Sequence, residues 1–144
     1  PHWDDQARGL VSGLTRGSSL RHLARAAIES IAYQVRDVFE AMQASAGGSL
    51  NVLMVDGGVT RNEQLMQFQA DIIGVPMQRN DTAELSAMGA AYLAGLATGV
   101  WASTDELAAL PRSVKRFEPT MELAERDRLI AGWRDAVART TLHP

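Results

Sequence analysis

The stretch LNVLMVDGGVTRNEQL, residues 50–65, constrains the fold of this 144-residue chain more than any other. Residues 50–55 are apolar except for Asn51, which is the pattern of a strand buried on both faces, as in a parallel sheet covered by helices. Gly57 and Gly58 follow immediately, and the residues after them have helical spacing. The stretch therefore predicts a buried strand, a tight turn and a helix.

The helix after the turn has a start signal and a stop signal. Thr60 and Glu63 fit the T-x-x-E pattern of a capping box, in which each side chain bonds to the other's backbone amide. Gly74 is a natural stop. The apolar face between these signals is formed by Leu65, Met66, Phe68, Ile72 and Ile73. The same spacing recurs at Asp81 and Glu84, ahead of a thin helix rich in glycine and alanine.

Strands and helices alternate along the whole chain. A long helix is expected from Leu20, capped by Ser18 or Ser19, to about Gly47, and a short second strand is expected at VPMQ, residues 75–78. Ser103 or Thr104 opens a short helix, and a last helix is expected over about 121–140. Such alternation indicates right-handed βαβ crossovers and an α/β fold in which parallel strands are flanked by helices.

Two strands are few for such a sheet, since typical sheets have about 4–6 strands. The chain also opens with Pro1 rather than methionine. We therefore expect it to be part of a longer protein, with further strands upstream of Pro1. What shortened the chain stays open.

Composition excludes several classes of function. The net charge is −3 without any basic block, so neither nucleic acid nor an anionic membrane is expected as a partner. The absence of cysteine excludes disulfide scaffolds and thiol catalysis. Residues 85–104 carry no charge and are long enough to span a bilayer, but small residues dominate them, which favours a tightly packed helix.

The two glycines lie where α/β proteins bind ligands, beyond the carboxyl end of a strand and before a helix N-terminus that attracts phosphates. Gly57 and Gly58 lack Cβ atoms, so a ligand can touch the backbone there. Asn62 can offer both a donor and an acceptor to a base or a sugar. A plain strand-to-helix turn would use the same residues, and both interpretations stay open at this point.

Other chemistry finds little support. His2, His22 and His143 lack the spacing of a zinc site, and no G-x-S-x-G elbow surrounds a serine. His22 is expected to have a structural role on the first turn of the long helix. Trp133 is expected in the core, and the scattered carboxylates are expected on solvated helix faces. The residues therefore predict no catalytic group and no metal ligand in this chain.

A wider pattern resembles the second signature of the FGGY carbohydrate kinases. It consists of Gly9-x-Val11-x-Gly13-Leu14, then His22-Leu23, then Ala26-Ala27-Ile28-Glu29. Five longer stretches resemble the glycerol-phosphorylating members of this family more than their sugar-kinase relatives. They are GLTRG, ESIAYQVRDVFEAM, VDGGVTRNEQLMQFQADIIGVP, GAAYLAGLATGVW and AGWRDAV. The resemblance covers nearly the whole chain and falls on the C-terminal part of these enzymes.

The resemblance implies the later half of the C-terminal, ribonuclease-H-like lobe of an actin-like ATPase. Residues 1–17 would be loop and strand, 18–98 a βα core with a nucleotide-binding turn, and 99–144 C-terminal helices. In this family, the second glycine and the asparagine four residues later contact the nucleotide. Gly58 would thus pack against the phosphate–ribose region, Asn62 would reach the adenosine and Gly57 would shape the turn. The role of Asp56 stays open.

The implied reaction transfers a phosphoryl group from ATP, with Mg²⁺, to glycerol, giving ADP and glycerol 3-phosphate in the cytoplasm. The family's catalytic base, glycerol-binding residues and metal ligands would lie upstream of this chain, so the chain alone should be inactive. The complete enzyme is expected to be a homo-oligomer. A kinase for xylulose or gluconate, or a non-enzymatic scaffold, remains the alternative.

Overall fold

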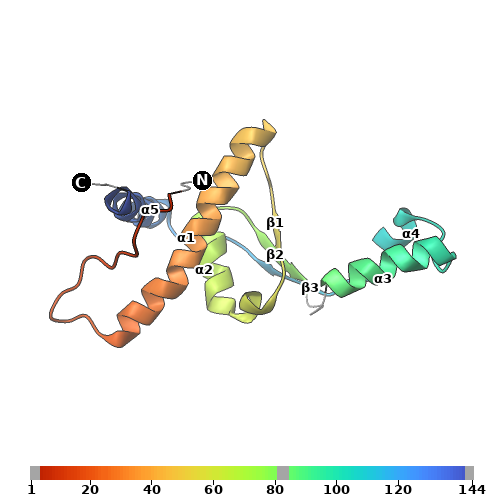
Figure 1. Ribbon diagram of the computed structural model, residues 1–144, viewed down its shortest axis with the longest axis horizontal. Coiled ribbons are helices and arrows are strands. Elements are labelled where there is room, and N and C mark those ends of the chain that lie inside the picture. The colour runs from red at the N-terminus through yellow and green to blue at the C-terminus, as the bar shows by residue number, and fades with distance from the viewer. Residues whose placement is uncertain (1–3, 81–84, 142–144) are drawn as a thin grey trace.

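The computed structural model describes residues 4–80 and 85–141. It contains a three-stranded sheet with helices on one face, while α3 and α4 extend away from the sheet (Figure 1). The helices and strands, in chain order, are α1 (Leu20–Ala46), β1 (Leu53–Val55), the 3₁₀ helix η1 (Gly58–Arg61), α2 (Glu63–Ile73), β2 (Met77–Asn80), α3 (Leu85–Thr98), α4 (Thr104–Ala108), β3 (Val114–Phe117) and α5 (Leu123–Thr140).

The sheet has the order β1-β2-β3 and is mixed. Strands β1 and β2 are parallel, as the alternation of elements predicts, whereas β3 runs antiparallel to β2. Strand β3 contradicts the prediction of helices alone over residues 99–144. The register aligns Leu53, Met77 and Phe117 in one row across the three strands, and these side chains share the face that carries the helices.

The long helix α1 begins and ends where the sequence indicates. The backbone N–H of Ser19 donates to Nδ1 of His22 at 3.1 Å, so His22 has the structural role expected for it. Gly47 follows the last residue of the helix. The second expected capping box, Asp81 to Glu84, lies outside the described residues.

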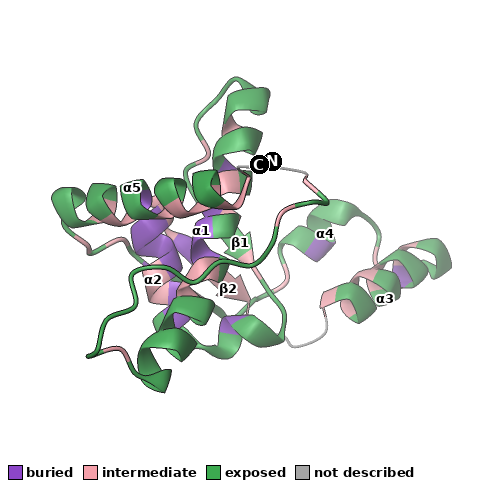
Figure 2. Cartoon of the chain, turned by 60° about the vertical axis from the view of Figure 1, so that its left-hand side comes forward, coloured by how far each residue is buried: buried purple, intermediate pink, exposed green. Residues whose placement is uncertain are grey.

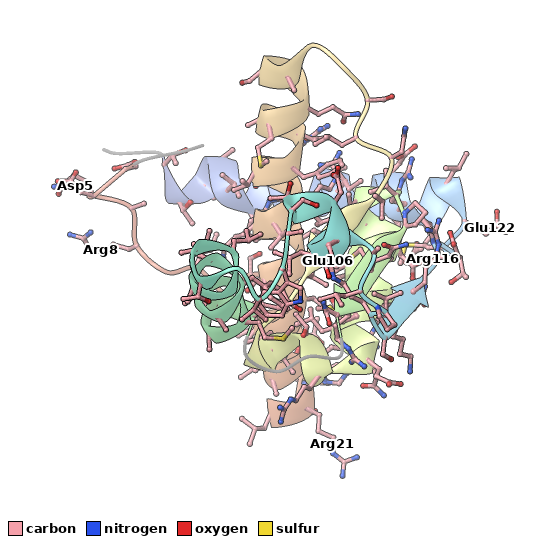
Figure 3. The ribbon with its side chains drawn as sticks, turned by 90° about the vertical axis from the view of Figure 1, so that its right-hand side faces the viewer. Asp5, Arg8, Arg21, Glu106, Arg116 and Glu122 are labelled. Atoms are coloured by element: carbon pink, nitrogen blue, oxygen red, sulfur yellow. The ribbon has the colours of Figure 1, made fainter. Side chains whose placement is uncertain are left out.

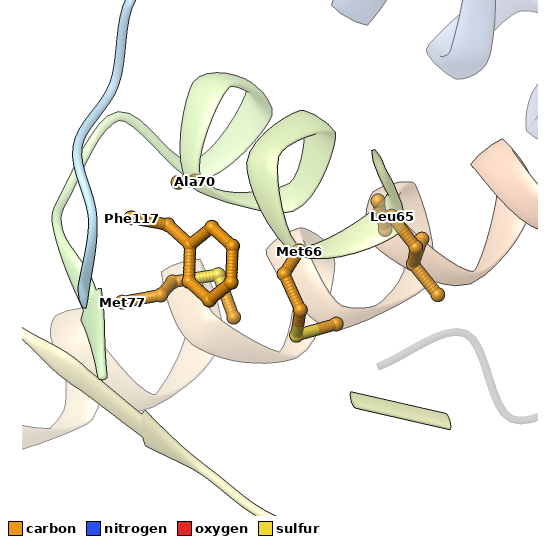
Figure 4. Close-up of a cluster of buried hydrophobic side chains, with 6 residues drawn as sticks. Leu65, Met66, Ala70, Met77 and Phe117 are labelled. Atoms are coloured by element: carbon orange, nitrogen blue, oxygen red, sulfur yellow. The ribbon is translucent and has the colours of Figure 1, made fainter. Parts of the chain in front are cut away.

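The core lies where α2 is packed between α1 and the sheet (Figure 4). Met77 is fully buried, and each buried side chain of this size contributes about 2 kcal/mol by leaving water. The buried cluster consists of Ala32, Leu65, Met66, Ala70, Met77 and Phe117.

The opposite face of the sheet is open among the described residues, which contradicts the expectation of a strand buried on both sides. Met54, in the middle of β1, is 68% exposed, because α1 and α2 pack on the other face. Buried residues gather on α2 and the facing part of α1, whereas most of α3 is not buried (Figure 2). No helix within 4–80 and 85–141 is long and apolar enough to cross a membrane.

Helix α3 has small side chains, as its glycine and alanine content predicts, and the indole of Trp101 packs directly against its backbone. A Cβ on Gly95 would overlap the indole of Trp101. The same indole meets the ring of Tyr92 edge to face, with centroids 5.3 Å apart. The close approach expected for this helix is thus made by a residue just beyond its own end.

Helix α5 docks on α1 through Trp133. Its indole stacks on the ring of Tyr33 with centroids 5.2 Å apart, and its Nε1 donates to Oδ2 of Asp37 at 2.8 Å. Burial raises the pKa of Tyr33 to about 12. Trp133 is half-buried, so its expected place in the core is confirmed only in part.

The buried carboxylate of Asp71 on α2 fixes the loop that joins β3 to α5. Its Oδ1 accepts from the backbone N–H of Thr120 at 2.6 Å and of Met121 at 3.2 Å. Gln67, one turn earlier, donates to the carbonyl of Glu118 at 2.7 Å. These bonds tie the end of the chain to α2.

Replacing Asp71 by alanine should lower the free energy of unfolding by about 2–3 kcal/mol, because two backbone amides lose a charged acceptor. Asp135→Ala is the control, since that carboxylate is 62% exposed and pairs with Arg139 on its own helix. It should cost less than about 0.5 kcal/mol. Urea denaturation measures both, and equal losses would contradict the role assigned to Asp71.

Candidate nucleotide site

Residues 57–62 form the glycine turn, which leaves the carboxyl end of β1 and leads into α2. Gly57 has a φ of 93°, in the region that only glycine adopts without strain. The backbone then forms η1, a single short 3₁₀ turn, before the α-helix begins at Glu63. The conformation of the turn therefore requires glycine at position 57.

Gly58 is different, because the fold of the chain itself does not demand it. Its φ is not in the positive region, and a Cβ built on it would meet no described atom within 4 Å. The backbone at Gly58 is exposed. The backbone at position 58 is therefore accessible from outside the chain.

Asn62 ends η1 and caps α2. Its backbone N–H donates to the carbonyl of Val59 at 3.1 Å, and its Oδ1 accepts from the backbone N–H of Leu65 at 3.1 Å. The residue is exposed. Oδ1 serves the helix, and the Nδ2 amide supplies the two donors of this side chain.

The predicted capping box of Thr60 and Glu63 is wrong. The hydroxyl of Thr60 donates back to the carbonyl of Gly57 at 2.7 Å, inside the 3₁₀ turn. Asn62 therefore takes the capping position, two residues later than expected. The carboxylate of Glu63 instead pairs with Lys115 on β3, and the hydrogen bond and charge of that ammonium lower the pKa of Glu63.

Two cations that the sequence analysis missed lie behind the turn. Val55, Arg79 and Lys115 are aligned across the three strands. Nη1 of Arg79 donates to the carbonyl of Thr60 at 3.0 Å, and both cations lie over the ring of Phe117. Only the three-dimensional register brings them together, because 36 positions separate Arg79 from Lys115 in the sequence.

A groove of about 580 Å³ opens beside Asn62, between the first half of α1 and the start of α2. An ion pair between Arg25 and Glu29, 2.5 Å long, lies at its α1 side. The lining residues are Arg25, Ile28, Glu29, Asn62, Gln64, Leu65, Gln67 and Phe68. Asn62 thus belongs both to the glycine turn and to the wall of a groove.

The acidic side chains singled out in the sequence are mostly exposed. Asp5, Glu106 and Glu122 are exposed on the surface, as expected for solvated charges (Figure 3). Within the part of the chain that the structure describes, no three His, Asp or Glu side chains are grouped so that they could hold a metal ion. His2 and His143 lie outside these residues.

Residues 1–98 match the C-terminal domain of the FGGY family of carbohydrate kinases, and the chain belongs to this family. Among curated relatives, it is 54% identical over 140 residues to the glycerol kinase of Solidesulfovibrio magneticus. It is 56% identical over 139 residues to the glycerol kinase of Carboxydothermus hydrogenoformans. These alignments cover 97% and 96% of this chain but only 28% of each relative.

Solved structures give the same result. A glycerol kinase of Plasmodium falciparum, crystallised with ADP, superimposes with a TM-score of 0.89 and 34% identity over 100% of this chain and 29% of its own. A xylulose kinase of Rhodospirillum rubrum follows with a TM-score of 0.70 and 27% identity, over 89% of this chain and 26% of its own. The resemblance to FGGY kinases and the expected C-terminal lobe of their actin-like fold are therefore confirmed.

Asn62→Asp should leave the stability of the chain within about 0.5 kcal/mol of the parent, because aspartate caps helices as well as asparagine does. Asn62→Ala removes the acceptor for Leu65 and should cost about 1 kcal/mol. Thermal and urea unfolding compare the two variants. Equal losses for aspartate and alanine would contradict the capping role.

Proposed function

We propose that this chain is the nucleotide-binding C-terminal part of a glycerol kinase. The complete enzyme would convert ATP and glycerol into ADP and glycerol 3-phosphate. The observation that carries the proposal is the identity of 54–56% to glycerol kinases over nearly the whole chain. The aligned region includes the glycine turn, in which a Cβ on Gly58 would meet no described atom within 4 Å.

The three predicted site residues would act together on the nucleotide. Gly57 sets the path of the backbone, so that Gly58 can lie against the phosphate–ribose region. The free amides at the start of η1 and α2 suit an anionic ligand. The Nδ2 amide of Asn62 would donate to the adenosine while its Oδ1 caps α2. In this arrangement, one end of the Asn62 amide binds the ligand and the other end caps the helix.

Phosphoryl transfer mostly needs alignment of the reactants, a divalent cation and a base for the attacking hydroxyl. In this proposal, the chain contributes to alignment of the nucleotide only. By the family resemblance, the metal ligands and the catalytic base would lie upstream of this chain, and within residues 4–80 and 85–141 no three acidic or histidine side chains are grouped to hold Mg²⁺. Glycerol would likewise be bound elsewhere, and the chain alone would be inactive.

Two further properties of the complete enzyme belong to the proposal. A cytoplasmic location suits a kinase that consumes ATP, and the family resemblance favours a homo-oligomer. Neither nucleic acid nor a membrane is proposed as a partner, in keeping with a net charge of −3 without a basic block.

The principal test is ADP release by the complete translation product that carries this sequence, with MgATP and either glycerol, xylulose or gluconate. Turnover that depends on glycerol supports the proposal. Turnover only with xylulose or gluconate would agree with the kinase family but would show that glycerol is the wrong substrate. No turnover with any of them, together with no nucleotide binding, would favour a scaffold.

Gly58→Val should weaken ADP binding at least about tenfold, because the added side chain occupies the volume proposed for the ligand. Gly48→Val is a matched control, since Gly48 also lacks described neighbours within 4 Å of a Cβ but lies before β1. Asn62→Asp should weaken ADP binding by a similar factor, since it replaces a donor by a negative charge. Calorimetry with the complete protein measures all three variants.

These variants also separate binding from folding. Gly58→Val and Asn62→Asp should both unfold at nearly the temperature of the parent protein. Unchanged ADP affinity in both variants would show that residues 57–62 are only a strand-to-helix turn.

A further inference from the structure

We propose that Arg79 on β2 is a positioning residue that holds the glycine turn in the shape that binds the nucleotide. This inference rests on the proposed function, because it assigns Arg79 a role at the same site. Arg79 itself need not touch the ligand. It would act through the carbonyl of Thr60, which lies between Gly58 and Asn62 in the turn.

The position of Arg79 follows from the sheet. Strands β1 and β2 are parallel, and Arg79 is the register partner of Val55, the last residue of β1. The glycine turn begins just beyond Val55, so the side chain of Arg79 starts at the same edge of the sheet. From there Nη1 donates to the Thr60 carbonyl at 3.0 Å in a half-buried environment.

The bond from Arg79 acts together with a side-chain bond inside the turn. Thr60 is 8% exposed, and its hydroxyl donates to the carbonyl of Gly57 at 2.7 Å. The guanidinium thus holds Thr60, and Thr60 in turn holds the first residue of the turn. A 3₁₀ turn has weaker internal hydrogen bonds than an α-helix, so it depends more on such external bonds.

Lys115 supports the same region less strongly. Its ion pair with Glu63 holds the first residue of α2, but the two side chains are 43% and 59% exposed. Exposed pairs of this kind contribute little, whereas a charged donor on a buried carbonyl leaves that carbonyl unsatisfied when it is removed. The positioning role therefore falls to Arg79, and Lys115 provides a comparison on the neighbouring strand.

Arg79→Met removes the donor and keeps most of the apolar stem. It should raise the KM for ATP about tenfold in the complete enzyme, because a shift of the turn misplaces Gly58 and Asn62. The kcat and the KM for glycerol should stay within about twofold, since the chemistry lies elsewhere. Lys115→Met should change the KM for ATP less than about twofold.

Two further variants test whether Arg79 acts through the turn. Arg79→Lys keeps a charged donor that can reach a single carbonyl. It should reverse at least about a third of the rise in the KM for ATP that Arg79→Met causes. In an Asn62→Ala background, Arg79→Met should raise the KM for ATP by less than about threefold, because one of the two residues that it positions is already gone and only Gly58 remains to be misplaced. If Arg79→Met does not fold, Arg79→Gln replaces it, with a smaller expected rise in the same direction.

These variants distinguish a wrong nucleotide site from a wrong positioning role of Arg79. If Gly58→Val and Asn62→Ala leave the KM for ATP unchanged, the proposed nucleotide site is wrong. If they raise it but Arg79→Met does not, only the positioning role is wrong. A full effect of Arg79→Met in the Asn62→Ala background would also overturn that role and would indicate direct contact of Arg79 with the phosphates.

Discussion

The burial of α2 is the constraint on which the rest of the structure depends. One side of this helix packs on α1 and another on the sheet, and its residues supply half of the central apolar cluster. Its body also carries Gln67 and Asp71, which bind the loop before α5. A helix enclosed in this way cannot slide or rotate without losing apolar contacts and buried hydrogen bonds together. The long helix, the third strand and the last helix therefore all have their places defined relative to α2.

This enclosure determines what the exposed end of the helix can do. The first turn of α2 has free backbone amides, and Asn62 is held at its start by the cap bond to Leu65. From the sheet side, Arg79 bonds to Thr60 in the turn and Lys115 pairs with Glu63, the first residue of α2, so both the turn and the start of the helix are held. A binding surface that is fixed before the ligand arrives loses little conformational entropy on binding. The buried half of α2 and the exposed turn thus act as one unit.

Local signals in the sequence predict most of these elements but not their three-dimensional relations. The long helix, the parallel pair β1–β2, α2 with its stop at Gly74, and the short helix after Ser103 follow from periodicity and caps, although β1 is limited to Leu53–Val55 and β2 lies at Met77–Asn80 rather than at 75–78. Strand β3 was missed because four residues between two prolines carry too short a pattern, although valine and phenylalanine at its ends are typical of strands. The capping box failed for a different reason. Thr60 satisfies Gly57 inside a 3₁₀ turn, and sequence spacing alone does not distinguish that bond from a bond to the helix.

The two glycines of the candidate site show most clearly that local sequence patterns do not predict three-dimensional surroundings. Both are adjacent and look equivalent in the sequence, yet Gly57 is required by its backbone angle, whereas no described neighbour restricts position 58. Position 58 therefore leaves room for the ligand that we propose, whereas position 57 is set by the backbone. Arg79 is the converse case, since its sequence position suggests nothing, but the parallel register puts it behind Thr60. The sequence therefore identifies where a nucleotide could touch the chain, and the structure identifies what would hold that surface in place.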